Sequence, residues 1–551
     1  MQDWYKNMSF YQIWIRSFAD GNDDGIGDLL GVYDKLTYIK SLGVDGIWFC
    51  PIYPSPNADF GYDISDYKNI HPDYGTLSDF KRVLNRAHEL GLKVIMDLVI
   101  NHTSDEHPWF IESRKGGEDN PYKDYYIWRD GKGVKLPNNW ESFFEGKAWE
   151  WCEERGQYYL HIFAKKQPDL NMDNPAVREE IKSIMRFWLD MGVDGFREDV
   201  ITYISKHEQL PDGIPFLPAI NGLPFYKDGP NLLRYLREFR AVAGEYGAVQ
   251  IGEAPMTPVK TALQYLRGED RVLDMMIQFD TMMADCFFTE YVHHPFSLRK
   301  LKRAFSRWQY ALDGVAWNAL YLENHDHPRV IDRYGSLEFW RESGTMLAAC
   351  YLFQQGTPFI YQGQELGMTN IALPSIDHYL DVASVNAYHS FFRWEPVEKR
   401  LRRIHRSSRD SARTPVQWSG EENAGFSTAE PWFYVNPNYR EINAAAEDRD
   451  PNSILNFYRK CLKLRKDCPT LLWGSYREYR WHSGWLYLYE RQWQGERILV
   501  SCSFSKRQRR FSLPEGYAAE QAELLLDNYP AEQPGQVGTL RPYEVQVLRW
   551  K

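Results

Sequence analysis

Short segments that carry acidic side chains follow apolar runs at separate points along the chain. Asp199, Glu253 and Asp326 come from three such segments, and Arg197 and His325 lie beside two of them. Each apolar run is typical of a buried strand, and a TIM barrel gathers the C-terminal ends of its strands around one site. Carboxyl groups brought together in this way are suited to cutting a glycosidic bond.

Arg197 and Asp199 stand two residues apart at the end of one apolar run. Side chains alternate along a strand, so both should point into the mouth of the barrel, whereas Phe196 and Glu198 point outward. A neighbouring guanidinium keeps a carboxylate ionised, and an ionised carboxylate is what attack on an anomeric carbon requires. Taken alone, this motif more often forms a structural ion pair, so the prediction depends on the other acids.

Glu253 ends the next apolar run, between Gly252 and Pro255 and with few charged residues nearby in sequence. An apolar setting raises the pKa of a carboxyl group and keeps a proton available for a leaving oxygen. The alternative is a solvated Glu at the start of a loop. His102 and the His325–Asp326 pair are candidates for holding sugar hydroxyls, although a single His is more often structural.

Hard oxygen donors cluster near the start of the chain at Asp20, Asn22, Asp24 and Asp28. Glycines between them permit a tight turn, and the spacing resembles the first positions of an EF-hand loop without its late Glu. Oxygen ligands suit Ca²⁺ or Mg²⁺. We therefore predict one structural Ca²⁺ or Mg²⁺ and no organic cofactor; a solvated Asp/Gly turn is the alternative.

The elements that position these residues alternate between strands and helices. Apolar runs at 10–15, 46–50 and 93–100 and strand ends at Asp199, Glu253, Phe279, Glu323 and Tyr361 make eight strands. Helical spacing over 36–42, 77–90 and 174–191 separates some of them. The fold class is therefore α/β, a (β/α)8 TIM barrel.

Two stretches break this alternation. Residues 101–170 lack helical periodicity and are rich in Trp, Tyr and Gly, which predicts a small domain inserted after strand 3. Short alternating runs from 473 to 551 predict a C-terminal antiparallel β-sandwich domain. The barrel itself is assigned to residues 1–100 and 171–472.

The bulk composition excludes several classes of protein. The 551 residues carry a net charge of -10, which argues against a nucleic-acid partner. Seven scattered cysteines without a C-x-x-C pair indicate neither a disulfide framework nor a zinc site. No signal peptide or membrane span is apparent. We expect a cytoplasmic protein, a monomer or weak homo-oligomer, with a small oligosaccharide as its partner and no membrane.

Together these segments resemble the α-amylase superfamily (glycoside hydrolase family 13), in its oligo-1,6-glucosidase and α-glucosidase branch. The resemblance spans essentially the whole chain. Its further motifs include Gly43-Val-Asp-Gly-Ile-Trp-Phe-Cys-Pro51, Gly61-Tyr62-Asp-Ile-Ser-Asp-Tyr67, Gln167-Pro-Asp-Leu-Asn171, Gly356-Thr-Pro-Phe-Ile-Tyr-Gln-Gly363 and Ser408-Arg-Asp-Ser-Ala-Arg413-Thr-Pro-Val-Gln-Trp418.

The resemblance implies a role for each matching residue. Asp199 resembles the nucleophile, Glu253 the general acid/base and Asp326 the stabiliser of the transition state. The implied substrate-binding residues are Asp59, Tyr62, His102, Phe144, Phe163, Gln167, Arg197, Val200, His325 and Arg413. Among these, Asp59 and Arg413 resemble a pair that grips the terminal glucose and closes the pocket, making the enzyme exo-acting. The implied metal ligands are Asp20, Asn22, Asp24, the Ile26 carbonyl and Asp28.

Val200 is the main mark of specificity, because Val after the nucleophile accompanies α-1,6 linkages in this branch. The resemblance therefore implies a retaining exo-α-glucosidase acting on isomaltose-type substrates, with the Asp199 and Glu253 carboxyls about 5–5.5 Å apart. The alternatives are an α-1,4-glucosidase, a sucrose isomerase or transglucosidase, and a trehalose-6-phosphate hydrolase. Only the basic run at 399–403 suggests a phosphate pocket. An inactive transporter subunit is disfavoured, because all three acids are present.

Four residues depart from the motifs of the branch: Glu198, Ala254, Glu323 and His327. All four are expected near the leaving sugar, where they would affect the acceptor preference. Glu198 should face the helix layer, where a buried carboxylate needs a partner.

Overall fold

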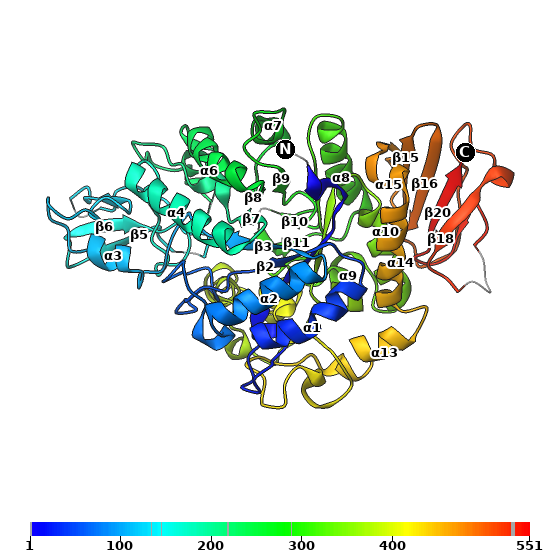
Figure 1. Ribbon diagram of the computed structural model, residues 1–551, viewed down its shortest axis with the longest axis horizontal. Helices are drawn as coiled ribbons and strands as arrows, with labels where there is room; N and C mark the ends of the chain where they lie inside the picture. Colours follow the sequence, from blue (N-terminus) through cyan, green and yellow to red (C-terminus); the bar gives the residue numbers. More distant parts are fainter. Residues whose placement is uncertain (1–2, 134, 145, 218–219, 288, 531–534) are drawn as a thin grey trace.

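The computed structural model describes residues 3–133, 135–144, 146–217, 220–287, 289–530 and 535–551. At its centre is a parallel eight-stranded sheet in the order β12-β13-β1-β2-β3-β7-β8-β9, nearly closed into a barrel because β9 lies beside β12 (Figure 1). The strands are β1 (Phe10–Ile13), β2 (Gly46–Phe49), β3 (Lys93–Leu98), β7 (Gly195–Glu198), β8 (Val249–Glu253), β9 (Met275–Ile277), β12 (Ala319–Leu320) and β13 (Thr357–Tyr361). The predicted barrel is confirmed.

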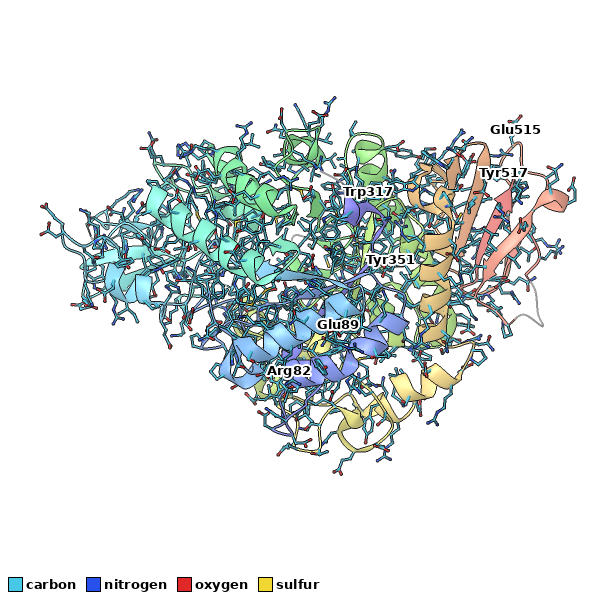
Figure 2. All side chains as sticks on the ribbon, viewed as in Figure 1. Arg82, Glu89, Trp317, Tyr351, Glu515 and Tyr517 are labelled. Carbon is cyan, nitrogen blue, oxygen red and sulfur yellow. The ribbon has the colours of Figure 1, made fainter. Side chains whose placement is uncertain are left out.

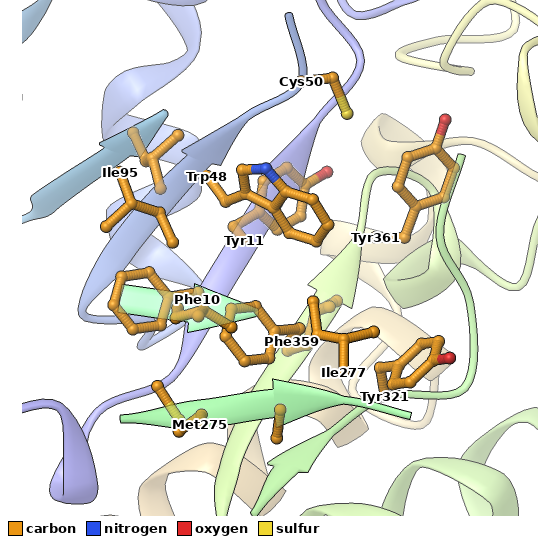
Figure 3. Packing of buried hydrophobic residues seen from close by; sticks show 14 of the residues in the cluster. Phe10, Tyr11, Trp48, Cys50, Ile95, Met275, Ile277, Tyr321, Phe359 and Tyr361 are labelled. Carbon is orange, nitrogen blue, oxygen red and sulfur yellow. The ribbon is translucent and has the colours of Figure 1, made fainter. Parts of the chain in front are cut away.

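The barrel interior is filled by large apolar side chains. Figure 3 shows Phe10, Phe359, Ile95 and Met275 meeting from four strands, and the rings of Phe10 and Phe359 stack with their centroids 5.4 Å apart. All four side chains are buried. Such packing leaves no channel, so chemistry is confined to the ends of the barrel.

Helices alternate with the strands and surround them. They include α1 (Leu29–Ser41), α2 (Leu77–Glu89), α4 (Pro175–Met191), α6 (Leu232–Tyr246), α7 (Val259–Leu266), α8 (Leu298–Leu312), α9 (Val330–Tyr334) and α10 (Trp340–Leu352). Local sequence fixes their ends: Thr76 and Asp79 form a capping box before α2, and Gly192 ends α4 in the left-handed region. The helices predicted over 77–90 and 174–191 are therefore close to those observed.

Two smaller sheets flank the barrel. Within 101–170, α3 (Pro108–Ser113) accompanies the antiparallel strands β4 (Trp128–Arg129), β6 (Gln157–Leu160) and β5 (Trp149–Cys152). At the other end lies the antiparallel order β14 (Ser475–Tyr479), β15 (Leu486–Trp493), β16 (Glu496–Ser503), β20 (Val545–Trp550) and β18 (Glu523–Asp527). The domain boundaries given above remain predictions.

A second, two-stranded layer covers the C-terminal sheet. It pairs β17 (Arg509–Arg510) with β19 (Thr539–Leu540), and Leu540 joins a buried cluster with Leu488 and Leu548. Tyr517, at the outer end of this region in Figure 2, packs edge-on against Trp550 at a centroid distance of 4.7 Å. This arrangement agrees with the predicted β-sandwich.

Helices of the last third connect the barrel to the C-terminal sheet. α10 and α14 (Ile454–Asp467) lie between them in Figure 1, with α15 (Pro469–Trp473) leading into β14. The shorter elements are α5 (Leu223–Tyr226), β10 (Cys286–Phe287), β11 (Thr289–His293), α11 (Val382–Asn386), α12 (Val397–Ser407) and α13 (Ala444–Arg449). A bilayer-crossing helix would need more length and apolarity than any helix in the described ranges has.

Candidate active site

A cavity of about 520 Å³ opens where several barrel strands end. The predicted residues that line it are Asp59, Tyr62, His102, Phe144, Phe163, Asp199, Val200, Glu253 and Asp326. The remaining four predicted substrate-binding residues, Gln167, Arg197, His325 and Arg413, are fully buried behind this wall. The structure thus brings together acids from the ends of β7 and β8 and from the loop after β12.

Arg197 connects the acids of the first two segments. Its Nη1 lies 2.7 Å from Asp97 Oδ1 and 2.7 Å from Asp199 Oδ1, and its Nη2 contacts the Glu253 carboxylate. Arg197 and Asp199 therefore point the same way, as the strand alternation predicted. The expectation that Glu253 has few charged neighbours is wrong, because the guanidinium of Arg197 reaches it from the adjacent strand β7.

Three carboxyls around one guanidinium would carry an excess of negative charge if all were ionised. Burial raises the pKa of Asp97 to about 6 despite the contact with Arg197. Burial also raises the pKa of Asp199 well above its usual range; Arg197 opposes that rise, and Glu253 adds to it. Arg197 is therefore not sufficient by itself to keep Asp199 ionised, contrary to the prediction from the sequence, and attack by Asp199 requires the proton of the Asp199–Glu253 pair to lie on Glu253.

Asp326 has the opposite electrostatic setting. Although burial favours the neutral acid, His325, Arg409 and Arg413 hold the pKa of this carboxyl well below its usual range. His325 Nε2 lies 3.0 Å from Asp326 Oδ2, and both guanidinium groups lie 3.2 Å from Oδ1. Asp326 is thus an ionised carboxylate facing the same cavity as Asp199 and Glu253.

Asp59 pairs with a different arginine from the one predicted. Arg409 Nη2 lies 3.1 Å from Asp59 Oδ1, whereas Arg413 donates to Asp326 and, at 3.2 Å, to the His325 carbonyl oxygen. The predicted Asp59–Arg413 pair is therefore wrong in its arginine. Arg409 begins the 3-10 turn η8 (Arg409–Ala412) and Arg413 directly follows it, and only Arg409 lines the cavity.

Neutral polar groups and rings complete this side of the cavity. Gln167 donates to Asp59 Oδ2 at 3.2 Å, and His102 Nε2 lies 3.1 Å from the Tyr62 carbonyl oxygen. Burial lowers the pKa of His102 to about 3, so its ring is neutral. The Tyr62 ring stacks on His325 with an interplanar angle of 3° and a centroid distance of 5.2 Å. His102 and Tyr62 line the cavity and offer a hydrogen-bonding ring and a flat apolar face to a sugar, whereas Gln167 and His325 support them from behind.

Val200 is fixed directly to one of the acids. Its backbone lies in the left-handed region (φ 35°), a strained conformation for a β-branched residue. Its N–H donates to Glu253 Oε2 at 3.0 Å, and its side chain lines the cavity. A substitution at Val200 would therefore affect the position of the Glu253 carboxylate.

The four residues that depart from the motifs of the branch lie in three different environments. Glu198 is buried away from the cavity, so its predicted place near the leaving sugar is wrong. Gln250 donates to its Oε1 at 2.5 Å, which is the partner that the sequence did not identify. Glu323 is buried in a 3.1 Å ion pair with Arg329, and neither it nor the buried Ala254 lines the cavity, so their predicted place beside the leaving sugar is wrong. His327 does line the cavity.

The predicted metal loop lies apart from the cavity. Asp28 caps α1 by accepting from the Gly31 N–H at 2.7 Å, while its buried Oδ2 has no hydrogen-bond partner among the described residues. Asp20 Oδ2 accepts from Ser427 Oγ at 2.6 Å. The loop carboxylates do not all lie within 4.8 Å of one another. The hard oxygen donors and the unpartnered Asp28 oxygen nevertheless fit a Ca²⁺ or Mg²⁺ ion.

Sequence reasoning missed two charged residues among the described residues of the cavity wall, Arg409 and Glu290. Arg409 lies four residues before Arg413 in a motif already singled out, so its type and position were visible. Glu290 lies on β11 of the short β10–β11 hairpin and belongs to no motif of the resemblance. No sequence signal separated Glu290 from other surface acids.

The α-amylase catalytic-domain model matches residues 12–474. The chain belongs to the α-amylase family of glycoside hydrolases. It is 46% identical over 555 residues to the oligo-1,6-glucosidase of Parageobacillus thermoglucosidasius, covering 99% of each chain. It is 43% identical to the trehalose-6-phosphate hydrolase of Bacillus subtilis, covering 99% of this chain and 98% of that one.

Solved structures of the same family superimpose over the whole chain. The trehalulose synthase from Pseudomonas mesoacidophila matches with a TM-score of 0.93 at 40% identity, covering 100% of this chain and 99% of that one. The trehalose-6-phosphate hydrolase of Bacillus licheniformis matches with a TM-score of 0.93 at 42% identity, covering 99% of each chain. Members of the α-amylase family that share this fold thus carry names for different reactions. The substrate must therefore be argued from the cavity.

Proposed function

We propose that this enzyme is a retaining exo-acting α-glucosidase that hydrolyses α-1,6 bonds at the non-reducing ends of isomaltose-type oligosaccharides. The observation that carries the proposal is the placement of Asp199, Glu253 and Asp326 on one cavity with two distinct charge settings. The relatives named oligo-1,6-glucosidase, 43% to 46% identical over nearly the whole chain, support the linkage.

Each acid has a separate task in this mechanism. Asp199 attacks C1 of the terminal glucose while Glu253 gives its proton to the departing oxygen, forming a covalent glucosyl-enzyme. Glu253 then takes a proton from water, which releases glucose in the α configuration. Asp326, held ionised by His325 and two arginines, stabilises the positive charge that develops on the sugar ring. Contact of Asp199 and Glu253 with one guanidinium supports the short separation that retention requires, about 5–5.5 Å.

The Asp59–Arg409 pair supports exo action. Both residues line the cavity beside Asp326, and their ion pair links two separate loops across the wall. A terminal glucose seated against this pair would be closed off beyond its 4-hydroxyl. One glucose is therefore removed at a time.

Phosphorylated substrates are disfavoured by the charge of the cavity. Arg409 is the one Lys or Arg among the described lining residues, and it is already shared by Asp59, Asp326 and Asp381. In the basic run that suggested a phosphate pocket, Lys399 and Arg403 instead pair with Glu395, and neither lines the cavity. The basic run at 399–403 therefore gives no support to the trehalose-6-phosphate hydrolase alternative.

Glucose release from isomaltose, maltose, sucrose, trehalose and trehalose-6-phosphate tests the proposal. Among these substrates, isomaltose should show the highest kcat/KM, because Val200 is hydrogen-bonded to Glu253 on the side of the cavity where the leaving sugar lies. A preference for maltose or sucrose would contradict the linkage but retain the mechanism. Activity on trehalose-6-phosphate alone would contradict the charge argument as well.

We also propose that Asp20, Asn22, Asp24, the Ile26 carbonyl and Asp28 hold one structural Ca²⁺ or Mg²⁺. The ion would connect the loop before α1 to the N-terminus of α1 and take no part in the reaction. We further propose that the protein works in a reducing cytoplasm, which its seven free cysteines support. The oligomeric state we propose is a monomer or weak homo-oligomer.

A further inference from the structure

A fifth carboxylate, Glu290, lines the cavity outside the catalytic cluster. It projects from β11, the second strand of the hairpin that follows β9. The other four lining carboxylates, Asp59, Asp199, Glu253 and Asp326, each contact Arg197, Arg409 or Arg413. Glu290 instead lies beside His327, and its side chain is 24% exposed.

Strand β9 connects Glu290 to the side of the cavity that holds the proposed acid. Glu253 ends β8 and pairs with Ile277 of β9. Phe279, two residues further on, packs against His327, the neighbour of Glu290. The group that departs from Glu253 must leave on that side.

His327 is a buried ring with unused hydrogen-bonding capacity. Its side chain is 1% exposed, and its Nδ1 lies 2.8 Å from Glu290 Oε1. The carboxylate is poorly aligned with the ring N–H, so neither ring nitrogen has a hydrogen-bond partner among the described residues. Phe279 packs edge-on against the ring at 5.3 Å and holds it in place. Buried polar groups of this kind are normally satisfied, which points to a ligand.

We propose that Glu290 and His327 bind the hydroxyls of the leaving sugar and select neutral sugars over phosphorylated ones. A carboxylate accepts from two neighbouring hydroxyls, and an imidazole ring presents two nitrogens that can hydrogen-bond to hydroxyls. The apolar side chains of Met256, Phe279 and Phe287 line the same region and suit the faces of a glucose ring. This inference rests on the proposed function, whose leaving group is a sugar.

A phosphate on the leaving sugar would meet the Glu290 carboxylate instead of a cation. Like charges in a cavity of low polarity repel strongly, and Arg409 is committed to three acids elsewhere. Removing the charge at Glu290 while keeping its shape should therefore relax the discrimination against phosphate.

The test compares wild-type enzyme with E290A, E290Q and H327A on three substrates. The leaving group of isomaltose is a sugar. The leaving group of p-nitrophenyl α-glucoside carries no sugar hydroxyls, although the glucose transferred to the enzyme is the same. Trehalose-6-phosphate has a leaving sugar that carries a negatively charged phosphate. E290A and H327A should each lower kcat/KM on isomaltose about 10-fold to 100-fold, as expected for a lost hydrogen bond to a charged or buried group. The loss on the aryl glucoside should be several-fold smaller. E290Q should raise the ratio of trehalose-6-phosphate to isomaltose kcat/KM at least about fivefold.

Equal losses on isomaltose and the aryl glucoside would overturn the inference, as would no loss on isomaltose or an unchanged phosphate ratio in E290Q. E338Q is the matched control, because Glu338 is exposed and pairs with Lys506. If H327A does not fold, H327Q takes its place. A wild-type preference for maltose would refute only the proposed linkage, and the same contrast is then measured with maltose.

Discussion

Replacing Arg409 tests which guanidinium holds the terminal sugar. Its side chain, 12% exposed, lies 3.1 Å from Asp59, 3.2 Å from Asp326 and 2.8 Å from Asp381. Truncating one partner of a buried charge pair in a binding site costs about 2–5 kcal/mol of binding free energy. Asp326 keeps Arg413, and Asp381 keeps the hydroxyl of Ser384 at 2.6 Å, so a loss of about 3 kcal/mol is expected.

A loss of about 3 kcal/mol in transition-state binding corresponds to about a 100-fold fall in kcat/KM. R409A should show a fall of that size on isomaltose, because Asp59 and Asp326 lose their shared cation. R403A is the control: Arg403 pairs with Glu395 on the outside of the cavity, so kcat/KM should change less than about twofold.

A double-mutant cycle separates Arg409 from Arg413. Residues in direct contact show coupling energies of about 0.5–3 kcal/mol, and residues without contact add nearly independently. The cycle of R409A with D59N should therefore give a coupling of at least about 1 kcal/mol, and the cycle of R413A with D59N a smaller one. A larger coupling for Arg413 would refute the assignment and restore the pair that the sequence suggested.

Three further predictions concern stability. Burial raises the pKa of Glu198 from 4.5 to about 7, so the folded state binds the extra proton and stability falls as pH rises between these values. E198Q removes this loss, so the gain in unfolding midpoint of E198Q over wild type should be greater at pH 8 than at pH 5; equal differences would contradict the burial argument. Chelation with EDTA should lower the unfolding midpoint by several degrees, reversibly with Ca²⁺, and a D24A variant should be insensitive; a wild-type midpoint indifferent to both would refute the metal site. Arg465 donates to the carbonyl oxygens of Leu352 and Gln354 at the end of α10, so R465M should lower the free energy of unfolding by about 2–4 kcal/mol in a urea titration, leaving KM unchanged; a smaller loss would mean that water replaces the guanidinium.

The barrel was predictable because its strands are short, apolar and buried on both faces. Even β9 and β12, with three and two residues, left a visible run before Phe279 and Glu323. The positions of the three acids followed, since parallel strands end on one side of the barrel. The pairing of Arg197 with Asp199 followed from strand alternation.

Contacts between distant segments were not predictable in the same way. Arg409 begins one 3-10 turn and Arg413 directly follows it, and only the path of that turn decides which guanidinium reaches Asp59. Gln250 meets Glu198 because β7 and β8 are neighbours, although the residues lie 52 positions apart. Glu290 enters the cavity through a hairpin too short to show a sequence pattern.

The anomer of the glucose first released from p-nitrophenyl α-glucoside, which yields a single glucose, tests the central mechanism most directly. Proton NMR during the first minutes distinguishes the two anomers before mutarotation mixes them. Attack by Asp199 followed by water predicts α-glucose as the first product, from a carboxyl pair about 5–5.5 Å apart. Initial release of β-glucose would mean a single displacement by water and would contradict the role assigned to Asp199.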